Sequence, residues 1–193
     1  DHRADSLRIA SVSVAAEVVL TPQLAVSVWV EGGASTAPSL ENILRVVVAY
    51  RILAFGGVLL HSAGVVRDGR AHIFFGHSGA GKTTISRTSL AAGLTTLSDD
   101  LNLVAPADDG VVTAHPVPFA GELRGSTQLA GPAPVAALHH LHKAAEPRIE
   151  LLGPGEAVAA LLASSPTVNS DPLRRDQLLD NLTAIAASTP VSR

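Results

Sequence analysis

One eight-residue segment limits the folds open to this chain more than any other feature. Residues 76–83 read GHSGAGKT and match the pattern G-x-x-x-x-G-K-[ST] in full. Glycines reach backbone angles closed to other residues and lack Cβ atoms, so successive N–H groups can point at phosphate oxygens. The pattern needs a strand before it and a helix after it, and the sequence predicts these at 71–75 and 82–92. It therefore predicts an α/β fold with a phosphate-binding loop.

Each part of this loop has an expected role in holding a nucleoside triphosphate. We expect Lys82 to place its ammonium between the β- and γ-phosphates, and Thr83 to offer its hydroxyl to Mg²⁺. The predicted nucleotide-binding residues are Gly76, His77, Ser78, Gly79, Ala80, Gly81, Lys82, Thr83 and Thr84. The predicted cofactors are ATP and Mg²⁺. A chance glycine-rich turn is the alternative, but it would not require the flanking strand and helix.

The composition indicates a domain with an aliphatic core. Of the 193 residues, 47% are hydrophobic but only 3% are aromatic, so Val, Leu, Ile and Ala must fill the core. The net charge is −3 without a basic stripe, which argues against a duplex nucleic-acid partner. The absence of Cys excludes disulfides and thiolate metal sites.

The most apolar stretch, residues 44–66, does not read as a membrane span. Arg45, Arg51 and His61 interrupt it, and no clean apolar run of about 20 residues is left. No signal peptide is apparent either. We therefore expect a cytoplasmic protein without a membrane partner.

Hydrophobic periodicity and turn residues predict a mixed sheet with flanking helices. The expected strands are 7–20 (one or two strands), 24–31, 58–66, 71–75, 95–98, 101–105, 111–115, 135–142 and 148–152. The expected helices are 39–54, 82–92, 155–164 and 172–187. Ser39 is the expected cap of the first helix, and Asp171 followed by Pro172 the expected start of the last. We expect a single domain over 1–193, with a β-rich part at 1–38 and the loop-bearing core at 39–190.

Three polar residues outside the loop are candidates for the chemistry. Asp99 and Asp100 end the strand after the loop helix, where phosphate-loop proteins commonly carry the acidic partner of Mg²⁺. Because side chains alternate along a strand, one carboxylate would face the metal and the other the acceptor. An ordinary acidic turn, as at Asp108 and Asp109, is the alternative. His61 lies in the strand expected to pair with the loop strand, although a structural histidine is the alternative there.

A cluster of histidines occupies the predicted strand at 135–142. His140 and His142 share one face of this strand, a spacing that could hold a metal, with His139 on the other face. No acidic third ligand is evident nearby, so a solvated or interfacial strand is the favoured interpretation.

Together, these features resemble the catalytic domain of HPr serine kinase/phosphorylase and its shorter relatives. That group is similar in its nucleotide-binding core to ATP-dependent phosphoenolpyruvate carboxykinase. The matching stretch is residues 60–104, with HSAGV at 61–65, the loop at 76–83, and LSDD at 97–100. The spacings are also like the family's, because His61 lies 21 positions before Lys82 and Asp99 lies 17 positions after it. A less specific resemblance extends over 39–190.

The resemblance implies the fold class and the reaction. The fold would be α/β, with a P-loop kinase core of the HPr kinase / phosphoenolpyruvate carboxykinase type and a mixed sheet with flanking helices. The activity would be ATP-dependent transfer of the γ-phosphate to a Ser or Thr hydroxyl of a protein or peptide. Asp99 would be the general base, and His61 would hydrogen-bond and position Asp99. Lys82 and the loop backbone would hold the phosphates.

The resemblance also implies a metal site and departs from the family in places. Thr83 and Asp100 would serve Mg²⁺, and Glu122 matches a metal-side acid in a Glu-x-Arg-Gly signature at 122–125. His77 occupies a loop position that is usually acidic in the full-length kinases. The helices that grip the carrier protein are not recognisable. The shorter relatives occur beside peptide-modification genes, which implies a peptide Ser as the acceptor. A small-molecule kinase, a carboxykinase-like enzyme, a non-catalytic ATP-binding module and a homo-oligomer stay open.

Overall fold

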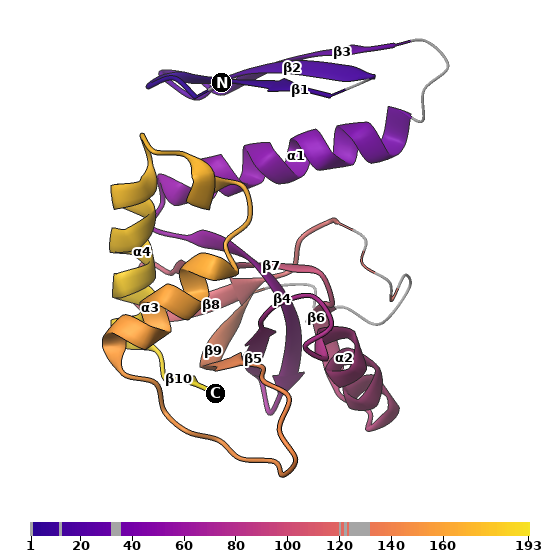
Figure 1. Ribbon diagram of the computed structural model, residues 1–193, viewed down its shortest axis with the longest axis vertical. Helices are drawn as coiled ribbons and strands as arrows, with labels where there is room; N and C mark the ends of the chain where they lie inside the picture. The colour runs from indigo at the N-terminus through magenta and orange to yellow at the C-terminus, as the bar shows by residue number, and fades with distance from the viewer. Residues whose placement is uncertain (1, 12, 32–35, 120, 122, 124–131) are drawn as a thin grey trace.

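Two sheets and four helices make up the part of the chain that the computed structural model describes, residues 2–11, 13–31, 36–119, 121, 123 and 132–193 (Figure 1). The strands are β1 Ser6–Ala10, β2 Val14–Val19, β3 Ala25–Val30, β4 Val58–Arg67, β5 Arg70–Phe75, β6 Thr95–Ser98, β7 Leu101–Pro106, β8 Val112–His115, β9 Ala133–His140 and β10 Val191–Ser192. The helices are α1 Thr36–Leu53, α2 Lys82–Ala91, α3 Pro154–Ala163 and α4 Arg175–Ser188, with a 3-10 turn at Val168–Ser170. The predicted mixed α/β architecture is confirmed.

Five strands of the larger sheet close into a barrel. β4 pairs antiparallel with β5 and β7, β7 with β8, and β8 with β9, while β9 returns to β5 as a parallel neighbour. The predicted hairpin between β4 and β5 is confirmed. Its turn places Asp68 and Gly69 at φ 52° and 74°, the left-handed angles that a two-residue hairpin turn favours. β6 pairs with the second half of β4, so the chain leaves α2 directly beside the central strand.

The three N-terminal strands form a separate antiparallel sheet in the order β1-β2-β3. This sheet lies across α1, and α1 separates it from the barrel (Figure 1). Leu7, Ala16 and Val18 on the sheet are buried in the same hydrophobic cluster as Ile43 and Val47 of α1. The apolar alternation along these strands therefore reflects one sheet face packed on a helix.

Helices cover the barrel on two sides. α2 packs against β4 and β6, while α3 and α4 pack against one another on the opposite flank (Figure 1). Fully buried side chains of these two helices include Leu161, Leu178, Leu182 and Ile185. The core is chiefly aliphatic, as the composition predicted. Within the described residues, no helix is both long and apolar enough to cross a membrane.

Two predicted helix starts are wrong. α1 already begins at Thr36, so Ser39 lies inside the helix and does not cap it. α4 begins only at Arg175, because the preceding residues form a turn. The Asp171 carboxylate closes that turn by accepting hydrogen bonds from the Leu173 N–H at 2.9 Å and from Arg174 at 2.8 Å. A capping-type side chain is thus used before the helix and not at its first residue.

The strand predicted at 148–152 is also wrong. An isolated bridge joins Leu151 to Ser192, and backbone hydrogen bonds beside it link Glu150 to Arg193 and Leu152 to Val191, but no strand forms. The Ile149 and Leu151 side chains are about three-quarters exposed, at 77% and 76%. Its apolar alternation therefore does not reflect burial. The last two strand residues, β10, pair with β9 and were not expected from the sequence.

Candidate functional site

The glycine-rich segment forms the connection between β5 and α2. The flanking strand and helix predicted for it are confirmed, since β5 ends at Phe75 and α2 begins at Lys82. Gly79 and Gly81 have φ of 77° and 115°, which explains why glycine occupies both positions. The unpaired N–H groups of the first turn of α2 lie at this connection, where a helix N-terminus favours an anion.

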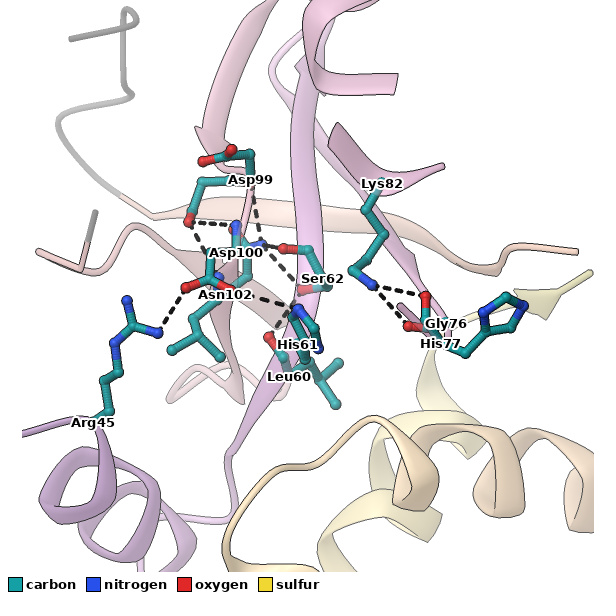
Figure 2. A network of polar contacts seen from close by, with 12 residues as sticks. Arg45, Leu60, His61, Ser62, Gly76, His77, Lys82, Asp99, Asp100 and Asn102 are labelled. Carbon is teal, nitrogen blue, oxygen red and sulfur yellow. Dashed lines mark hydrogen bonds and ion pairs between the residues drawn. The ribbon is translucent and has the colours of Figure 1, made fainter. Parts of the chain in front are cut away.

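Lys82 is folded back over the loop. Its Nζ donates to the carbonyl oxygens of Gly76 at 2.9 Å and His77 at 3.1 Å (Figure 2). The residue is buried, and burial lowers the pKa of its ammonium, against which the Asp100 carboxylate acts in the opposite direction. The ammonium is thus held at the loop by backbone carbonyls that a stronger anionic partner could replace.

Asp99 lies at the start of the turn from β6 to β7 and is 8% exposed. Its carboxylate accepts a hydrogen bond from the Leu123 N–H at 3.1 Å. The backbone of Gly121 lies so close that a Cβ atom there would overlap the carboxylate. A side chain at position 121 would therefore displace the Asp99 carboxylate, and the backbone around Asp99 fixes its direction.

Asp100 faces away from these groups, toward β4 and α1. One carboxylate oxygen lies 2.7 Å from the Arg45 guanidinium and the other 3.5 Å from Nε2 of His61 (Figure 2). Glu41, one turn earlier on α1, also binds Arg45, at 2.7 Å. The expectation that the two adjacent acids face different directions is confirmed. The pairing of His61 with Asp99 is wrong: because the side chains alternate, His61 meets Asp100.

His61 lies in β4 with its imidazole half-exposed. The backbone N–H of His61 donates to the carbonyl oxygen of Ser164 at 2.8 Å, which ties this part of β4 to the segment after α3. Burial is the largest cause that lowers the pKa of the imidazole, followed by the positive charge of Lys82; Asp100 opposes them, and Arg45 adds a smaller lowering. Together these effects favour the uncharged imidazole.

One cavity of about 520 Å³ brings the loop and the acidic turn together. It is lined by His61, Ser78, Gly79, Gly81, Lys82, Thr83, Thr84, Arg87, Asp99, Asp100 and Gly121. Of the predicted loop residues, Gly76, His77 and Ala80 are not in this lining, and the first two instead supply the carbonyl groups that hold Lys82. A space of this size and polarity suits a small charged ligand.

The buried side-chain amide of Asn102 lies next to the acidic turn. Asn102 donates from Nδ2 to the carbonyl oxygen of Ser62 at 2.9 Å and to its hydroxyl at 3.0 Å, which joins β7 to β4 (Figure 2). Gly64 lies against the Asn102 side chain, where a Cβ would come within 2.5 Å of Oδ1. Sequence reasoning missed Asn102 and Arg45, because no local pattern marks a residue whose role depends on a distant partner.

The expected metal residues are only partly covered by the structure. Glu122 lies outside the described residues. Thr83 and Asp100 line the same cavity as Lys82, and hydroxyl and carboxylate oxygens are the donors that Mg²⁺ prefers. These residues fit a magnesium ion held jointly with phosphate oxygens, a mode that needs few protein ligands.

The histidine cluster on β9 forms two separate pairs. His139 lies 3.2 Å from His72 and 2.9 Å from the Ser192 hydroxyl, while His140 lies 3.0 Å from His142. Burial, and to a lesser extent His72, lowers the pKa of His139 to about 4. Over the residues that the structure describes, no group of three or more potential ligands could hold a metal ion. The His72–His139 pair and the Ser192 contact join β9 to β5 and β10, whereas His140 and His142 contact each other at the end of β9.

Comparison with known families gives one match. A family model described as "ScmC: SynChlorMet cassette protein ScmC" matches residues 36–191. The match begins at the first residue of α1, reaches β10 and includes every residue that lines the cavity. No curated protein matches the sequence.

Proposed function

The chain belongs to the ScmC family of SynChlorMet cassette proteins, and we propose that it is an ATP-dependent phosphotransferase. In this proposal, residues 76–84 bind MgATP, and the γ-phosphoryl group passes to a Ser or Thr hydroxyl of a protein or peptide. The barrel would then be a P-loop kinase core of the HPr kinase / phosphoenolpyruvate carboxykinase type. One observation carries the proposal: Lys82, a glycine-rich loop at a helix N-terminus and two carboxylates line the same cavity.

The loop side of the cavity would hold the donor. The N–H groups of the loop and of the first turn of α2 would bind the phosphate oxygens. Lys82 would exchange the Gly76 and His77 carbonyls for β- and γ-phosphate oxygens, which form stronger charge-assisted hydrogen bonds. Thr83 and Asp100 would hold the Mg²⁺ that neutralises charge on these oxygens.

Asp99 would act on the acceptor. As the bond between the acceptor oxygen and the γ-phosphorus forms, the bond to the β,γ-bridging oxygen breaks, and its electron pair leaves with ADP. The hydroxyl proton passes to the Asp99 carboxylate. The Leu123 N–H and the close backbone of Gly121 keep that carboxylate in one orientation, which favours general-base catalysis.

His61 would be a positioning residue for Asp100. Its imidazole lies 3.5 Å from the Asp100 carboxylate, and its backbone is tied to Ser164. With Arg45 on the other carboxylate oxygen, His61 fixes the direction in which Asp100 faces the cavity. This assignment replaces the role that the family resemblance implied for His61.

The test separates binding from transfer. Asp99→Asn should lower transfer of γ-phosphate to Ser-containing peptides by about 10²–10⁴-fold while leaving MgATP affinity nearly unchanged. The exposed acidic turn at Asp108 offers a matched control, Asp108→Asn, which should transfer normally. An ATP-binding regulatory module would instead bind MgATP in all three proteins and transfer in none. A wild-type protein that does not bind MgATP would overturn the proposal as a whole.

A further inference from the structure

We propose that the acceptor hydroxyl reaches Asp99 on an extended peptide segment bound between α1 and the connection that follows α3. This inference rests on the proposed phosphotransferase function and specifies where its substrate binds. A second cavity, of about 340 Å³, adjoins the first and shares His61 and Asp100 with it. Its remaining lining is Asn42, Arg45, Val46, Leu59, Leu101, Pro166 and Thr167.

The proposed peptide groove extends beyond this second cavity. A third cavity, of about 550 Å³, shares Val46 and Thr167 with the second and is otherwise lined by Tyr50 and residues of the N-terminal part, chiefly of β1. The second and third cavities thus follow α1 from the cavity at the phosphate loop to the N-terminal sheet. A small metabolite would use only the part beside Asp100, whereas this continuous path suits an extended polypeptide on both sides of its Ser or Thr.

Strained backbone forms one wall of the groove. Thr167 has φ 74° and ψ −62°, and the Val168 N–H donates to the Pro166 carbonyl at 2.9 Å. This is the rare γ-turn with positive φ, which is unfavourable for a β-branched residue. Such strain persists only where the surroundings enforce it, and it is concentrated at sites that bind ligands.

The surroundings do enforce it. Before the turn, the Ser164 carbonyl accepts the His61 N–H, and the Ser165 hydroxyl donates to the Leu161 carbonyl at 2.9 Å. After the turn, Val168 is buried in the hydrophobic core. The γ-turn therefore places Thr167 where it lines two of the three cavities. The contact with His61 couples this wall to the first cavity, the one that contains the phosphate loop, which we call the phosphate-side cavity.

The lining indicates which residues should flank the acceptor. Val46, Leu59, Leu101 and Pro166 provide an apolar surface, and the Arg45 guanidinium is already held by Glu41 and Asp100. The groove next to the acidic pair therefore has no strong charge preference. We expect it to favour small aliphatic, uncharged residues beside the acceptor Ser or Thr.

The absence of Cys from the sequence allows the groove to be blocked at one atom. Asn42 is exposed on α1 and lines the second cavity, but not the phosphate-side cavity. The full chain carrying Asn42→Cys, with and without a bulky maleimide, would be assayed for MgATP binding, for ATP hydrolysis and for transfer. The acceptors are a degenerate octapeptide library with one central Ser or Thr and, separately, N-acetylserinamide. Ala184→Cys, exposed on α4, is the matched labelling control.

The labelled Asn42→Cys protein should bind MgATP and hydrolyse ATP normally but lose about 10²-fold of its peptide transfer, since the peptide is no longer positioned. The loss is measured as the ratio of labelled to unlabelled Asn42→Cys protein, the labelled Ala184→Cys control should transfer normally, and N-acetylserinamide should be a much poorer acceptor than the peptides. Full peptide transfer by the labelled protein, or equal use of N-acetylserinamide, would overturn the groove alone. A wild-type protein that binds MgATP and transfers to neither acceptor would overturn the phosphotransferase function and the groove with it.

Discussion

The two sides of the cavity are built in different ways. The phosphate side consists of consecutive residues in a single connection between β5 and α2. The opposite side combines His61 of β4, the β6–β7 turn and Gly121. The adjoining cavity adds α1 and the segment after α3, and its ion pair joins Arg45 to Asp100 across 55 positions of sequence. The first side depends on local backbone geometry, whereas the second depends on packing between distant elements. Substitutions on the two sides should therefore affect different steps.

Lys82→Ala should have the largest effect and should damage both binding and transfer. It removes the cation expected between the β- and γ-phosphates, where a preorganised charge acts on ground state and transition state alike. We expect MgATP binding to be severely weakened and peptide transfer to fall by about 10³-fold. Calorimetry with MgATP and a radiolabelled transfer assay would measure both quantities.

The second lysine of the chain provides the control for this prediction. Lys143 is exposed and lies outside the phosphate-side cavity, so Lys143→Ala should leave both quantities unchanged. Thermal unfolding of both variants would reveal any loss of folding from the two hydrogen bonds that Lys82 makes to the loop. A folded Lys82→Ala protein with normal MgATP affinity would contradict the role of this side.

Gly121→Ala tests the opposite side at the carboxylate itself. The added Cβ would overlap the Asp99 carboxylate and force it to turn, while the loop and Lys82 remain untouched. We expect transfer to fall by about 10²-fold, as for a displaced catalytic group, with MgATP affinity unchanged. Gly155→Ala is the matched control, because a Cβ at Gly155 meets no atom within 4 Å. Equal loss of binding and transfer would show that the two sides are not separable.

The same contrast explains what the sequence could predict. The loop, its strand and its helix were predictable because glycine spacing and apolar periodicity are local signals. The partner of His61 was not predictable, because it depends on which of the two adjacent carboxylates, Asp99 or Asp100, lies beside β4 in the folded chain. Thr167 carries no signature either, because the constraint on it comes from its tertiary surroundings. The prediction that Ser39 caps the first helix was wrong because a residue type that favours caps also fits inside a helix.

Arg45→Gln should sharpen the comparison by changing metal affinity and not nucleotide affinity. The guanidinium lies 2.7 Å from Asp100 and competes with any cation that this carboxylate could hold. Removal of the guanidinium should tighten Mn²⁺ binding to the ADP complex by about tenfold, because the Asp100 carboxylate then no longer pairs with the positive charge of Arg45. Arg175→Gln, exposed on α4, is the control. Unchanged or weaker Mn²⁺ binding would remove Asp100 from the metal site or make Arg45 necessary for its orientation.

Thr167→Gly should have the smallest effect, and this effect should be an increase in stability. Glycine adopts φ 74° without the steric cost that a β-branched residue bears, about 1–3 kcal/mol, although it loses more chain entropy on folding. The free energy of unfolding should therefore rise by about 1 kcal/mol in urea denaturation. The exposed helical residue Thr183 provides the opposite control, because Thr183→Gly should lower it by about 0.5 kcal/mol. If the strain maintains the peptide groove, the stabilised Thr167→Gly protein should also transfer less well to peptides while binding MgATP normally. A gain in stability with full peptide transfer would mean that the turn is strained without serving the acceptor side.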